Sequence, residues 1–213
     1  MPHHHDFDAA SWDAHWGDGG HGAAAAEHES APNPAVLHET ASLTPGEALD
    51  AGCGAGPDAL ALAARGWRVT GADISERALA RAREAASAAG VAVHWVAADL
   101  TSWEPEQKWD LVISNYAHTT LPAADFYRRL AGWVAPGGTL LLTAHHRDDV
   151  APGQASTHPA DATATTEAIR ALFDPTHWRI ETARTAIRPG PDPAHRLHDV
   201  IVRAVRLPRP TVG

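Results

Sequence analysis

The residues best suited to chemistry lie in the stretch ALDAGCGAGPDA, at positions 48–59. Here Asp50 precedes three glycines at alternate positions, Gly52, Gly54 and Gly56. Glycine adopts backbone conformations that other residues avoid, and it lets the chain come close to a ligand. Asp50 and Asp58 stand on either side of this bend, where they would repel a phosphate and attract a cation. The stretch therefore predicts a turn that holds a positively charged ligand.

Two more acids follow later apolar runs. Asp73 ends the run WRVTGAD, and Asp99 comes shortly after the run VAVHWVA. In open parallel sheets, ligands bind beyond the carboxyl ends of the strands, where an acid about 20 residues after the glycine turn reaches ribose hydroxyls. We expect Asp73 to bind ribose and Asp99 to accept from an adenine amine, although either could instead cap the next segment. S-adenosylmethionine, which joins a cationic amino-acid end to ribose and adenine, would satisfy all three acids.

The segments that must position these acids alternate between short apolar runs and helical stretches. The runs are GEALDAG, WRVTGAD, VAVHWVA, WDLVISN and GTLLLTA. This alternation predicts an α/β fold, with a Rossmann-like, doubly wound, mostly parallel sheet. The clearest helix is SERALARAREAASAAG, in which Ser75 is a suitable N-cap and Gly90 a stop. Another helix is expected over LPAADFYRRLAGW, because its large apolar residues recur at helical spacing.

The carboxyl-terminal part is expected to close the sheet with an antiparallel hairpin. Strands are predicted at 178–186 and 197–205, joined by a short stretch rich in proline and glycine. A helix is predicted at 165–173. The polar segment 147–162 is predicted to be a loop that covers a site. We assign residues 41–206 to one domain and 207–213 to a flexible tail.

Residues 1–40 show no strand pattern and are expected to form a helical arm or lid over the site. Trp12 and Trp16 lie one helical turn apart in the stretch WDAHW. They could contact ligands, Trp16 the cofactor and Trp12 the substrate. They could also simply fasten the arm to the core, since paired aromatic residues usually pack together. Both interpretations can hold at once.

Composition narrows the class of partner. The chain has 213 residues, a formal net charge of −9 and a single cysteine. Basic residues are spread out, which disfavours nucleic acid or an anionic membrane as a partner and favours a small molecule. We expect a cytoplasmic location, since no apolar run is long enough to span a bilayer and the start lacks a signal-peptide pattern. The oligomeric state stays open.

Five motifs in order resemble those of class I S-adenosylmethionine-dependent methyltransferases. They are LDAGCGAG, VTGADIS, VAADL, WDLVISNYAH and VAPGGTLLL, spread over roughly residues 45–145. Within that superfamily the chain is most similar to small-molecule methyltransferases of the tellurite-resistance and thiopurine type, whose amino-terminal segment carries a similar Trp-x-x-x-Trp pattern. The stretch NYAH lacks the Asn/Asp-Pro-Pro-Tyr pattern of nucleic-acid and protein amino-group methylators, so those substrates are not expected.

The resemblance implies a seven-stranded sheet whose last strand is antiparallel, and it implies S-adenosylmethionine as cofactor. It also assigns roles to matching positions. Gly52 and Gly54 would leave room for the methionine end, and Asp50 would help to orient its ammonium group. The remaining cofactor and substrate positions would be Asp73 with Ile74 at the ribose, Asp99 with Leu100 at the adenine, and Asn115 with Tyr116 around the sulfonium.

Histidines supply candidate bases for an acceptor that carries a proton. His118 follows the fourth apolar run, and His145 and His146 end the fifth, so all three are expected near the same crevice. We expect His118 and His145 to be catalytic and His146 to contact substrate, although each could merely pack. A metal held by these histidines with Asp148 and Asp149 is not expected, because adjacent strand residues point to opposite faces.

The predicted function is methyl transfer from S-adenosylmethionine to a small nucleophile at sulfur, selenium, oxygen or nitrogen. One alternative is a protein of the same fold that uses S-adenosylmethionine without methyl transfer, as a regulator or cyclase. An NAD(P)-dependent oxidoreductase is less favoured, since the chain reads G-x-G-x-G where a dinucleotide fingerprint reads G-x-G-x-x-G.

Overall fold

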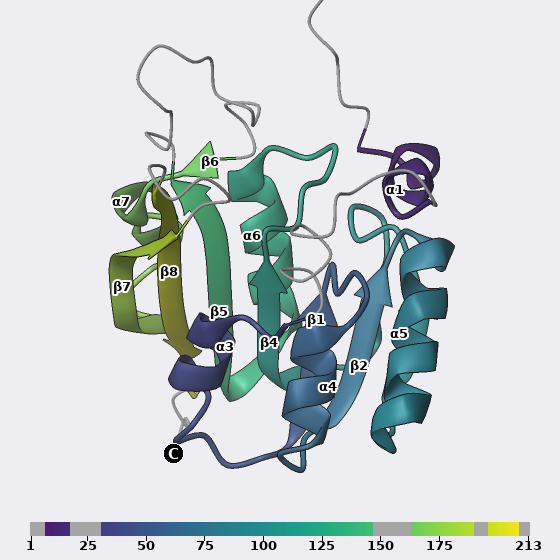
Figure 1. Cartoon of the computed structure of the whole chain (residues 1–213). Coiled ribbons are helices and arrows are strands. Elements are labelled where there is room, and N and C mark those ends of the chain that lie inside the picture. Colours follow the sequence, from purple (N-terminus) through teal and green to yellow (C-terminus); the bar gives the residue numbers. More distant parts are fainter. Residues whose placement is uncertain (1–6, 18–30, 147–162, 190–195, 209–213) are drawn as a thin grey trace, which may run out of the picture.

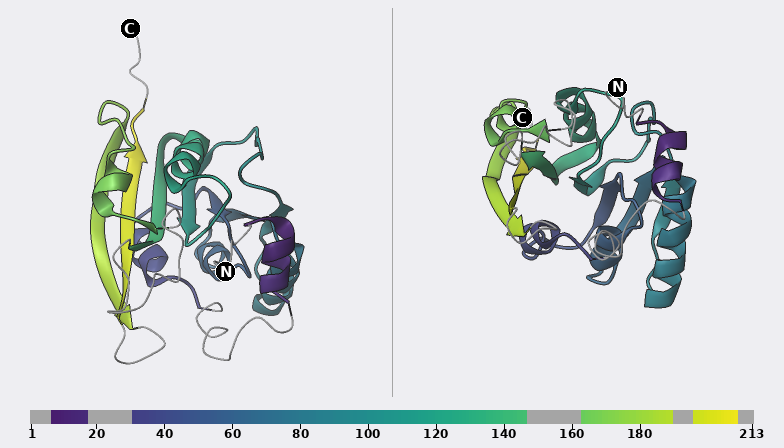
Figure 2. Two further views of the ribbon diagram at one scale, coloured as in Figure 1. Left: turned by 90° about the horizontal axis from the view of Figure 1, so that it is seen from above. Right: turned by 45° about the horizontal axis from the view of Figure 1, so that its top comes forward.

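The computed structural model describes residues 7–17, 31–146, 163–189 and 196–208. A single mixed sheet forms the middle of the molecule, and helices cover both of its faces (Figures 1 and 2). The strands are β1 (Glu47–Ala51), β2 (Arg68–Asp73), β3 (His94–Ala97), β4 (Trp109–Asn115), β5 (Val134–His146), β6 (Thr163–Ala164), β7 (Trp178–Pro189) and β8 (Arg196–Arg206). The helices are α1 (Ala9–His15), α3 (Pro34–Glu39), α4 (Pro57–Ala63), α5 (Glu76–Ala89), α6 (Ala123–Trp133) and α7 (Thr166–Arg170).

The strand order is β3-β2-β1-β4-β5-β8-β7, with β6 pairing to β5. Strands β1 to β5 are parallel, and β8 runs antiparallel to both β5 and β7. The predicted Rossmann-like fold and its carboxyl-terminal antiparallel hairpin are therefore confirmed. The expected seven strands are present, and an eighth is added because Thr163 and Ala164 pair with the end of β5. The order reverses between β1 and β4, which places a crevice beyond the ends of these two strands.

The sequence located α5 correctly, misplaced the end of α7, and led to the expectation of one helix that is absent. In α5 the Ser75 side chain accepts from the Ala78 N–H, and Gly90 ends the helix at φ 67°. Helix α7 ends at Arg170 and not at residue 173, because the amides of Leu172 and Phe173 bond three residues back, which tightens the chain into a turn. No helix forms between β3 and β4. Residues 98–108 instead form irregular backbone with a turn at 100–102. Arg129 Nε donates to the Leu100 carbonyl in this turn at 2.7 Å.

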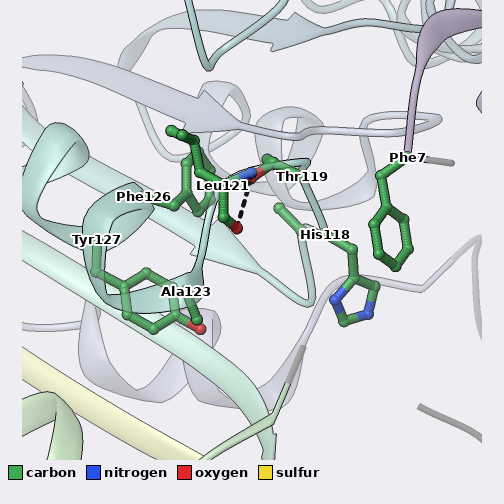
Figure 3. A pocket seen from close by; sticks show the side chains of 8 residues that line it. Phe7, His118, Thr119, Leu121, Ala123, Phe126 and Tyr127 are labelled. Carbon is green, nitrogen blue, oxygen red and sulfur yellow. Dashed lines mark hydrogen bonds between the residues drawn. The ribbon is translucent and has the colours of Figure 1, made fainter. Parts of the chain in front are cut away.

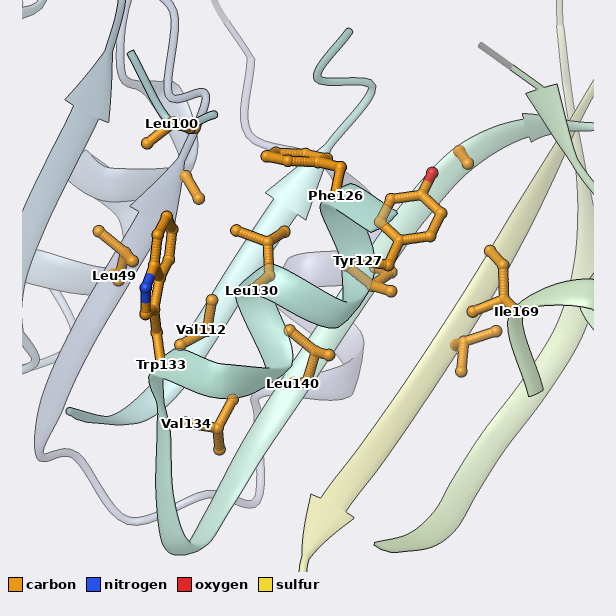
Figure 4. Packing of buried hydrophobic residues seen from close by; sticks show 14 of the residues in the cluster. Leu49, Leu100, Val112, Phe126, Tyr127, Leu130, Trp133, Val134, Leu140 and Ile169 are labelled. Atoms are coloured by element: carbon orange, nitrogen blue, oxygen red, sulfur yellow. The ribbon is translucent and has the colours of Figure 1, made fainter. Parts of the chain in front are cut away.

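Two apolar layers hold the sheet. On one face, α6 inserts Phe126, Leu130 and Trp133 against β4 and β5 (Figure 4). On the other, α3 and α4 bury residues such as Val36 and Leu62. Helix α3 therefore packs as part of the domain core, although the sequence interpretation grouped it with an amino-terminal arm. No helix in the described part of the chain is both long and apolar enough to cross a membrane.

A buried ion network fastens α3 to the carboxyl-terminal hairpin. The Glu39 side chain is 4% exposed, and its carboxylate accepts from Thr182 Oγ1 at 2.8 Å and from Arg184 Nη2 at 3.3 Å. Arg203 adds a hydrogen bond to the Glu39 carbonyl at 2.6 Å. Although burial opposes it, hydrogen bonds from Thr182 and Arg184 hold the pKa of Glu39 below its ordinary value. The charged carboxylate therefore stabilises the fold.

We predict that Glu39→Gln lowers the free energy of unfolding by about 1–3 kcal/mol at pH 7, because it removes the counter-charge of the partly buried Arg203, which is 19% exposed, and of the more exposed Arg184. The depressed pKa means that this stabilisation is present above the unfolded pKa of Glu39 and is lost as the pH falls through the folded value. The loss caused by the variant should therefore shrink toward pH 3 in urea unfolding. Glu76→Gln, which removes an exposed pair with Arg83, should cost less than about 1 kcal/mol. Equal losses from both variants would contradict the prediction.

Candidate functional site

The bend after β1 is built from residues in left-handed backbone conformations. Gly52, Gly54 and Gly56 have φ angles of 79°, 54° and 81°. Their missing side chains make room for three neighbouring segments. A Cβ would lie 2.6 Å from Ala117 Cβ at Gly52, 2.9 Å from the Trp16 ring at Gly54, and 2.5 Å from the Trp95 ring at Gly56. The glycine pattern, which the sequence analysis ascribed to a ligand, is thus also required by the protein's own packing.

The backbone of the bend is tied to β2. The Gly52 N–H donates to the Ala72 carbonyl at 2.8 Å, and the Gly54 N–H donates to Asp73 Oδ2 at 2.8 Å. The other carboxylate oxygen of Asp73 accepts from the Ser75 N–H at 2.9 Å. Asp73 therefore fixes the bend on one side and the start of α5 on the other.

Three carboxylates are buried around this bend. Asp50 is 2% exposed, Asp58 8% and Asp73 9%. Burial, together with the charges of Asp58 and Asp73, raises the pKa of Asp50 well above its ordinary value. Burial raises the pKa of Asp58 to about 6, opposed by hydrogen bonds from the Asn33 N–H and from Asn115. Burial also raises the pKa of Asp73, opposed by the N–H groups of Ser75 and Gly54.

One oxygen of this cluster lacks a hydrogen-bond partner among the described residues, namely Asp50 Oδ2. A buried carboxylate oxygen without a donor costs free energy, and a cationic donor would remove that cost. Oδ1 of Asn115 is likewise buried and without a partner among the described residues, while its Nδ2 donates to Asp58 Oδ2 at 2.9 Å. The arrangement suits a ligand that brings positive charge and several N–H donors.

The two positions expected at the adenine are placed differently. Asp99 is exposed, and its Oδ1 accepts from the N–H and the hydroxyl of Thr101 at 2.9 and 2.7 Å. This is the local cap that the sequence left open as an alternative. Leu100 is 5% exposed and belongs to the core layer of α6, whereas Ile74, next to Asp73, is half-buried.

Helix α1 lies against the start of α5 at the same end of the sheet (Figure 1). Oδ1 of Asp13 accepts from Ser75 Oγ at 2.6 Å, and the Arg81 guanidinium stands 5.7 Å from the Trp16 ring centre. Trp16 thereby reaches Gly54. Trp12 instead lies beside Phe7, with ring centres 6.1 Å apart. Of the two tryptophans, Trp16 meets the bend and Trp12 does not.

A row of aromatic rings follows β4 and β5. The ring centres of Phe7 and His118 are 5.6 Å apart, those of His118 and His145 5.8 Å, and those of His145 and Tyr116 4.6 Å. Tyr116 has φ 52°, the only positive value among the described non-glycine residues, and so turns the chain sharply after β4. The two histidines predicted to be catalytic are thus brought together, within one row of rings.

Beside this row lies a small cavity of about 30 Å³ (Figure 3). Its lining is largely apolar and consists of Phe7, Ala117, His118, Thr119, Leu121, Ala123, Phe126 and Tyr127. Of the two histidines that we predicted to be catalytic bases, His118 lines the cavity. His145 lies behind His118 in the row and does not line the cavity.

His146 points away from this cluster, as alternation along β5 predicts. Its ring lies 6.4 Å from that of His198 on β8. In the described part of the chain no group of three or more His, Cys, Asp or Glu side chains is placed to hold a metal ion. Asp148, Asp149 and the rest of the predicted loop 147–162 lie outside the described residues, as do residues 1–6, 18–30, 190–195 and 209–213.

Sequence reasoning missed the contacts that join the site across long distances in the chain. Asp58 accepts from the Asn33 N–H at 2.6 Å as well as from Asn115, and Asp13 caps the start of α5. The sequence marked Asp58 by its place beside the bend and by its place in the first turn of a helix, where acids are common. Its partners could not be predicted, because they lie 25 and 57 positions away in the chain, before α3 and at the end of β4.

A doubly wound sheet that reverses at β1 and β4, with a glycine bend and acids at its carboxyl edge, defines the Rossmann-like class of nucleotide- and nucleoside-binding domains. Residues 48–138 match the family model described as "Methyltransferase domain". The resemblance to S-adenosylmethionine-dependent methyltransferases is thereby confirmed over these residues. The narrower resemblance to the tellurite-resistance and thiopurine type stays a prediction.

Individual relatives agree with the family match. The chain is 38% identical over 128 residues to trans-aconitate 2-methyltransferase of Streptomyces coelicolor, covering 55% of this chain and 41% of that protein. It is 33% identical over 120 residues to probable thiol methyltransferase 2 of Arabidopsis thaliana, covering 52% of each. The chain thus spans about half the length, or less, of these relatives. Magnesium protoporphyrin IX methyltransferase from Synechocystis, solved with bound S-adenosylmethionine, superimposes with TM-score 0.61 at 25% identity, over 92% of this chain and 89% of that one.

We predict that Gly52→Ala lowers the free energy of unfolding by about 1–3 kcal/mol more than Gly66→Ala does. Both positions have positive φ angles, 79° and 91°, so both variants are strained. Only at Gly52 would the new Cβ also meet a close neighbour, Ala117, since the nearest atoms to one at Gly66 are those of Pro45, at 3.9 Å. Adding Ala117→Gly to Gly52→Ala should recover most of the difference in urea unfolding. Failure of the second change to recover stability would show that the contact with Ala117 is not the cause.

Proposed function

We propose that this chain transfers a methyl group from S-adenosylmethionine to a small-molecule nucleophile, at a sulfur, selenium, oxygen or nitrogen atom. The observation that carries the proposal is the buried Asp50 Oδ2, which has no partner among the described residues and lies next to the glycine bend. The family match over residues 48–138 supports the same conclusion. Two relatives are named for their acceptors, trans-aconitate and thiols, and these names support a small acceptor.

The residues present fit the cofactor. Asp50 would receive its ammonium group, and the backbone of Gly52 and Gly54 would lie along its amino-acid end. Asp73 would accept from the ribose hydroxyls, with Ile74 beside the sugar. Asp99 and Leu100 would meet the adenine. Trp16, carried by α1, would cover this end of the site, which supports residues 7–17 as part of a lid.

Bound S-adenosylmethionine supplies an electrophilic methyl group on a positively charged sulfur, which leaves as a neutral thioether. The protein's task is therefore to align the acceptor with that methyl group, and alignment of this kind can be worth about 7–11 kcal/mol. Buried carboxylates would keep the cationic end in place, and the aromatic row would border the reacting atoms. Asn115 and Tyr116, at the end of β4, would border the sulfonium.

The acceptor would enter the cavity beside His118. The eight lining residues include no Asp, Glu, Lys or Arg, which favours an uncharged acceptor. As the acceptor attacks, its proton would pass to His118. Behind it, His145 would steady the His118 ring by stacking. Trp12 would border the entrance through its contact with Phe7, and His146 would contact only an acceptor that extends toward β8.

We predict that Asp73→Asn weakens binding of both S-adenosylhomocysteine and 5′-methylthioadenosine about 10- to 100-fold. Both compounds contain the ribose, and an amide oxygen is a weaker acceptor than a carboxylate. Isothermal titration calorimetry measures the two affinities. Asp125→Asn, an exposed aspartate on α6, serves as the matched control and should change neither. Unchanged affinities in the Asp73 variant would remove its assignment to the ribose.

We predict that His118→Gln lowers kcat about 100-fold for acceptors that lose a proton, with the affinity for S-adenosylhomocysteine unchanged. A thiol, a phenol and an arylamine are suitable acceptors, followed by transfer of labelled methyl from S-adenosylmethionine. His94→Gln, an exposed histidine on β3, is the control and should leave kcat unchanged. A variant that keeps its kcat with every methylated acceptor would exclude His118 as the base.

A further inference from the structure

The orientation of the Asn115 amide is dictated by Asp58. Both carboxylate oxygens of Asp58 are used, Oδ1 by the Asn33 N–H at 2.6 Å and Oδ2 by Asn115 Nδ2 at 2.9 Å. An ionised carboxylate can only accept hydrogen bonds, so the NH₂ group of Asn115 must face Asp58. Its carbonyl oxygen, Oδ1, consequently faces the other way.

Among Asp50, Asp58, Asp73 and Asn115, two buried acceptor oxygens then remain without a partner in the described part of the chain, Asn115 Oδ1 and Asp50 Oδ2. Asp50 pairs in register with Ile113 of the neighbouring strand β4, and Asn115 lies two residues further along that strand. Because side chains alternate along a strand, Asp50, Ile113 and Asn115 all point to the same face, the one covered by α4. Asp58 projects from the first turn of α4. Two acceptors thus stand at the same end of adjoining strands, on the side where Asp58 lies.

We propose that Asp58 is a positioning residue, which turns the carbonyl oxygen of Asn115 toward the amino-acid end of the cofactor. Asn115 Oδ1 and Asp50 Oδ2 would then accept together from its ammonium group. This inference rests on the proposed function. It adds a role for Asp58, whose own oxygens are occupied and do not touch the ligand, and it makes Asn115 an acceptor for the ammonium.

The surroundings favour a positive ligand at this point. Asp50 on β1 lies close enough to Asp58 for their charges to interact, and Asp73 on β2 acts on Asp50 in the same way. The remaining titratable neighbour, Cys53, is buried, and burial raises the pKa of its thiol so that it carries no charge. With the pKa of Asp58 raised to about 6, its carboxylate is ionised at pH 8, where the orienting hydrogen bond requires it to be an acceptor.

The substitution Asp58→Asn separates orientation from packing. The new amide keeps one oxygen, which can still accept from the Asn33 N–H, and its NH₂ group then faces Asn115. Two NH₂ groups cannot bond to each other, so Asn115 turns its amide over and gives Oδ1 to position 58. Its own NH₂ group now faces the ammonium. Position 58 therefore still makes two hydrogen bonds, one with Asn33 and one with Asn115. In the site, the NH₂ group of Asn115 replaces its carbonyl oxygen and repels the ammonium group.

The experiment measures affinities for S-adenosylhomocysteine and 5′-methylthioadenosine at pH 8 by isothermal titration calorimetry. Both contain the adenosine part, and only the first carries the amino-acid end. We expect Asp58→Asn to weaken S-adenosylhomocysteine about 10- to 100-fold and to leave 5′-methylthioadenosine unchanged. Asp125→Asn is again the control. Circular dichroism and urea unfolding establish that each variant is folded.

A swap then tests the orientation directly. In the double variant Asp58→Asn with Asn115→Asp, the new carboxylate at position 115 accepts from the new amide at position 58 with one oxygen and offers the other to the ammonium. We expect the affinity for S-adenosylhomocysteine to return to within about threefold of wild type. A purely structural role for Asp58 predicts no such recovery, since the double variant departs further from the native pair.

Three results would overturn the inference. They are an unchanged affinity of Asp58→Asn for S-adenosylhomocysteine, an equal loss for both ligands, and a swap that fails to restore binding. Each of these leaves wild-type binding intact and so leaves the proposed function standing. Wild-type protein that binds neither compound would instead refute the proposed function, and this inference with it.

Discussion

The burial of Asp50 at the end of β1 is the constraint on which the rest of the site depends. A carboxylate with 2% exposure and one oxygen lacking a described partner weakens the fold unless a ligand compensates for it. Two further carboxylates, on α4 and at the end of β2, make the same region more negative. An arrangement that is unfavourable without a ligand is typical of a site adapted to bind a cation.

Stability for such a site has to come from elsewhere in the molecule. The two apolar layers on either side of the sheet supply most of it, since buried apolar surface is the dominant favourable contribution to folding. Glu39 is also a buried acid, but hydrogen bonds from its partners lower its pKa, whereas the pKa of Asp50 is raised. The fold therefore contains both kinds of buried acid. At the carboxyl edge of the sheet, Asp50 lacks a donor for one oxygen among the described residues. Glu39, between α3 and the hairpin, accepts from Thr182 and Arg184.

Long-range packing also changes how the glycine motif is understood. The sequence alone suggested that bare backbone leaves room for a ligand. In the structure, each of the three glycines also makes room for a side chain from another segment, Ala117, Trp16 or Trp95. The bend is thus the meeting point of the amino-terminal helix, the turn after β4 and strand β3. A substitution there would disturb three segments as well as any ligand.

The sequence by itself determined the alternating strands and helices, the antiparallel hairpin and the acids Asp50 and Asp73 at the sheet edge. These follow from local patterns, namely the period of apolar residues, caps such as Ser75 and stops such as Gly90. It also placed His118 and His145 near each other, because the ends of parallel strands meet at one edge. Local pattern was less reliable between β3 and β4, where the helix expected from alternation is absent and the chain turns at Asp99, with Arg129 bonded to the Leu100 carbonyl.

Only the tertiary structure decided which side chains meet. The pairing of Asp58 with Asn33 and Asn115, the row of rings from Phe7 to Tyr116, and the place of α3 in the core all join residues far apart in the chain. No periodicity encodes such contacts. They arise from the register of neighbouring strands and the packing of helices on them, which set distances and the direction of each hydrogen bond. That direction, a donor facing Asp58 and an acceptor facing away, is the kind of fact that a one-dimensional pattern does not contain.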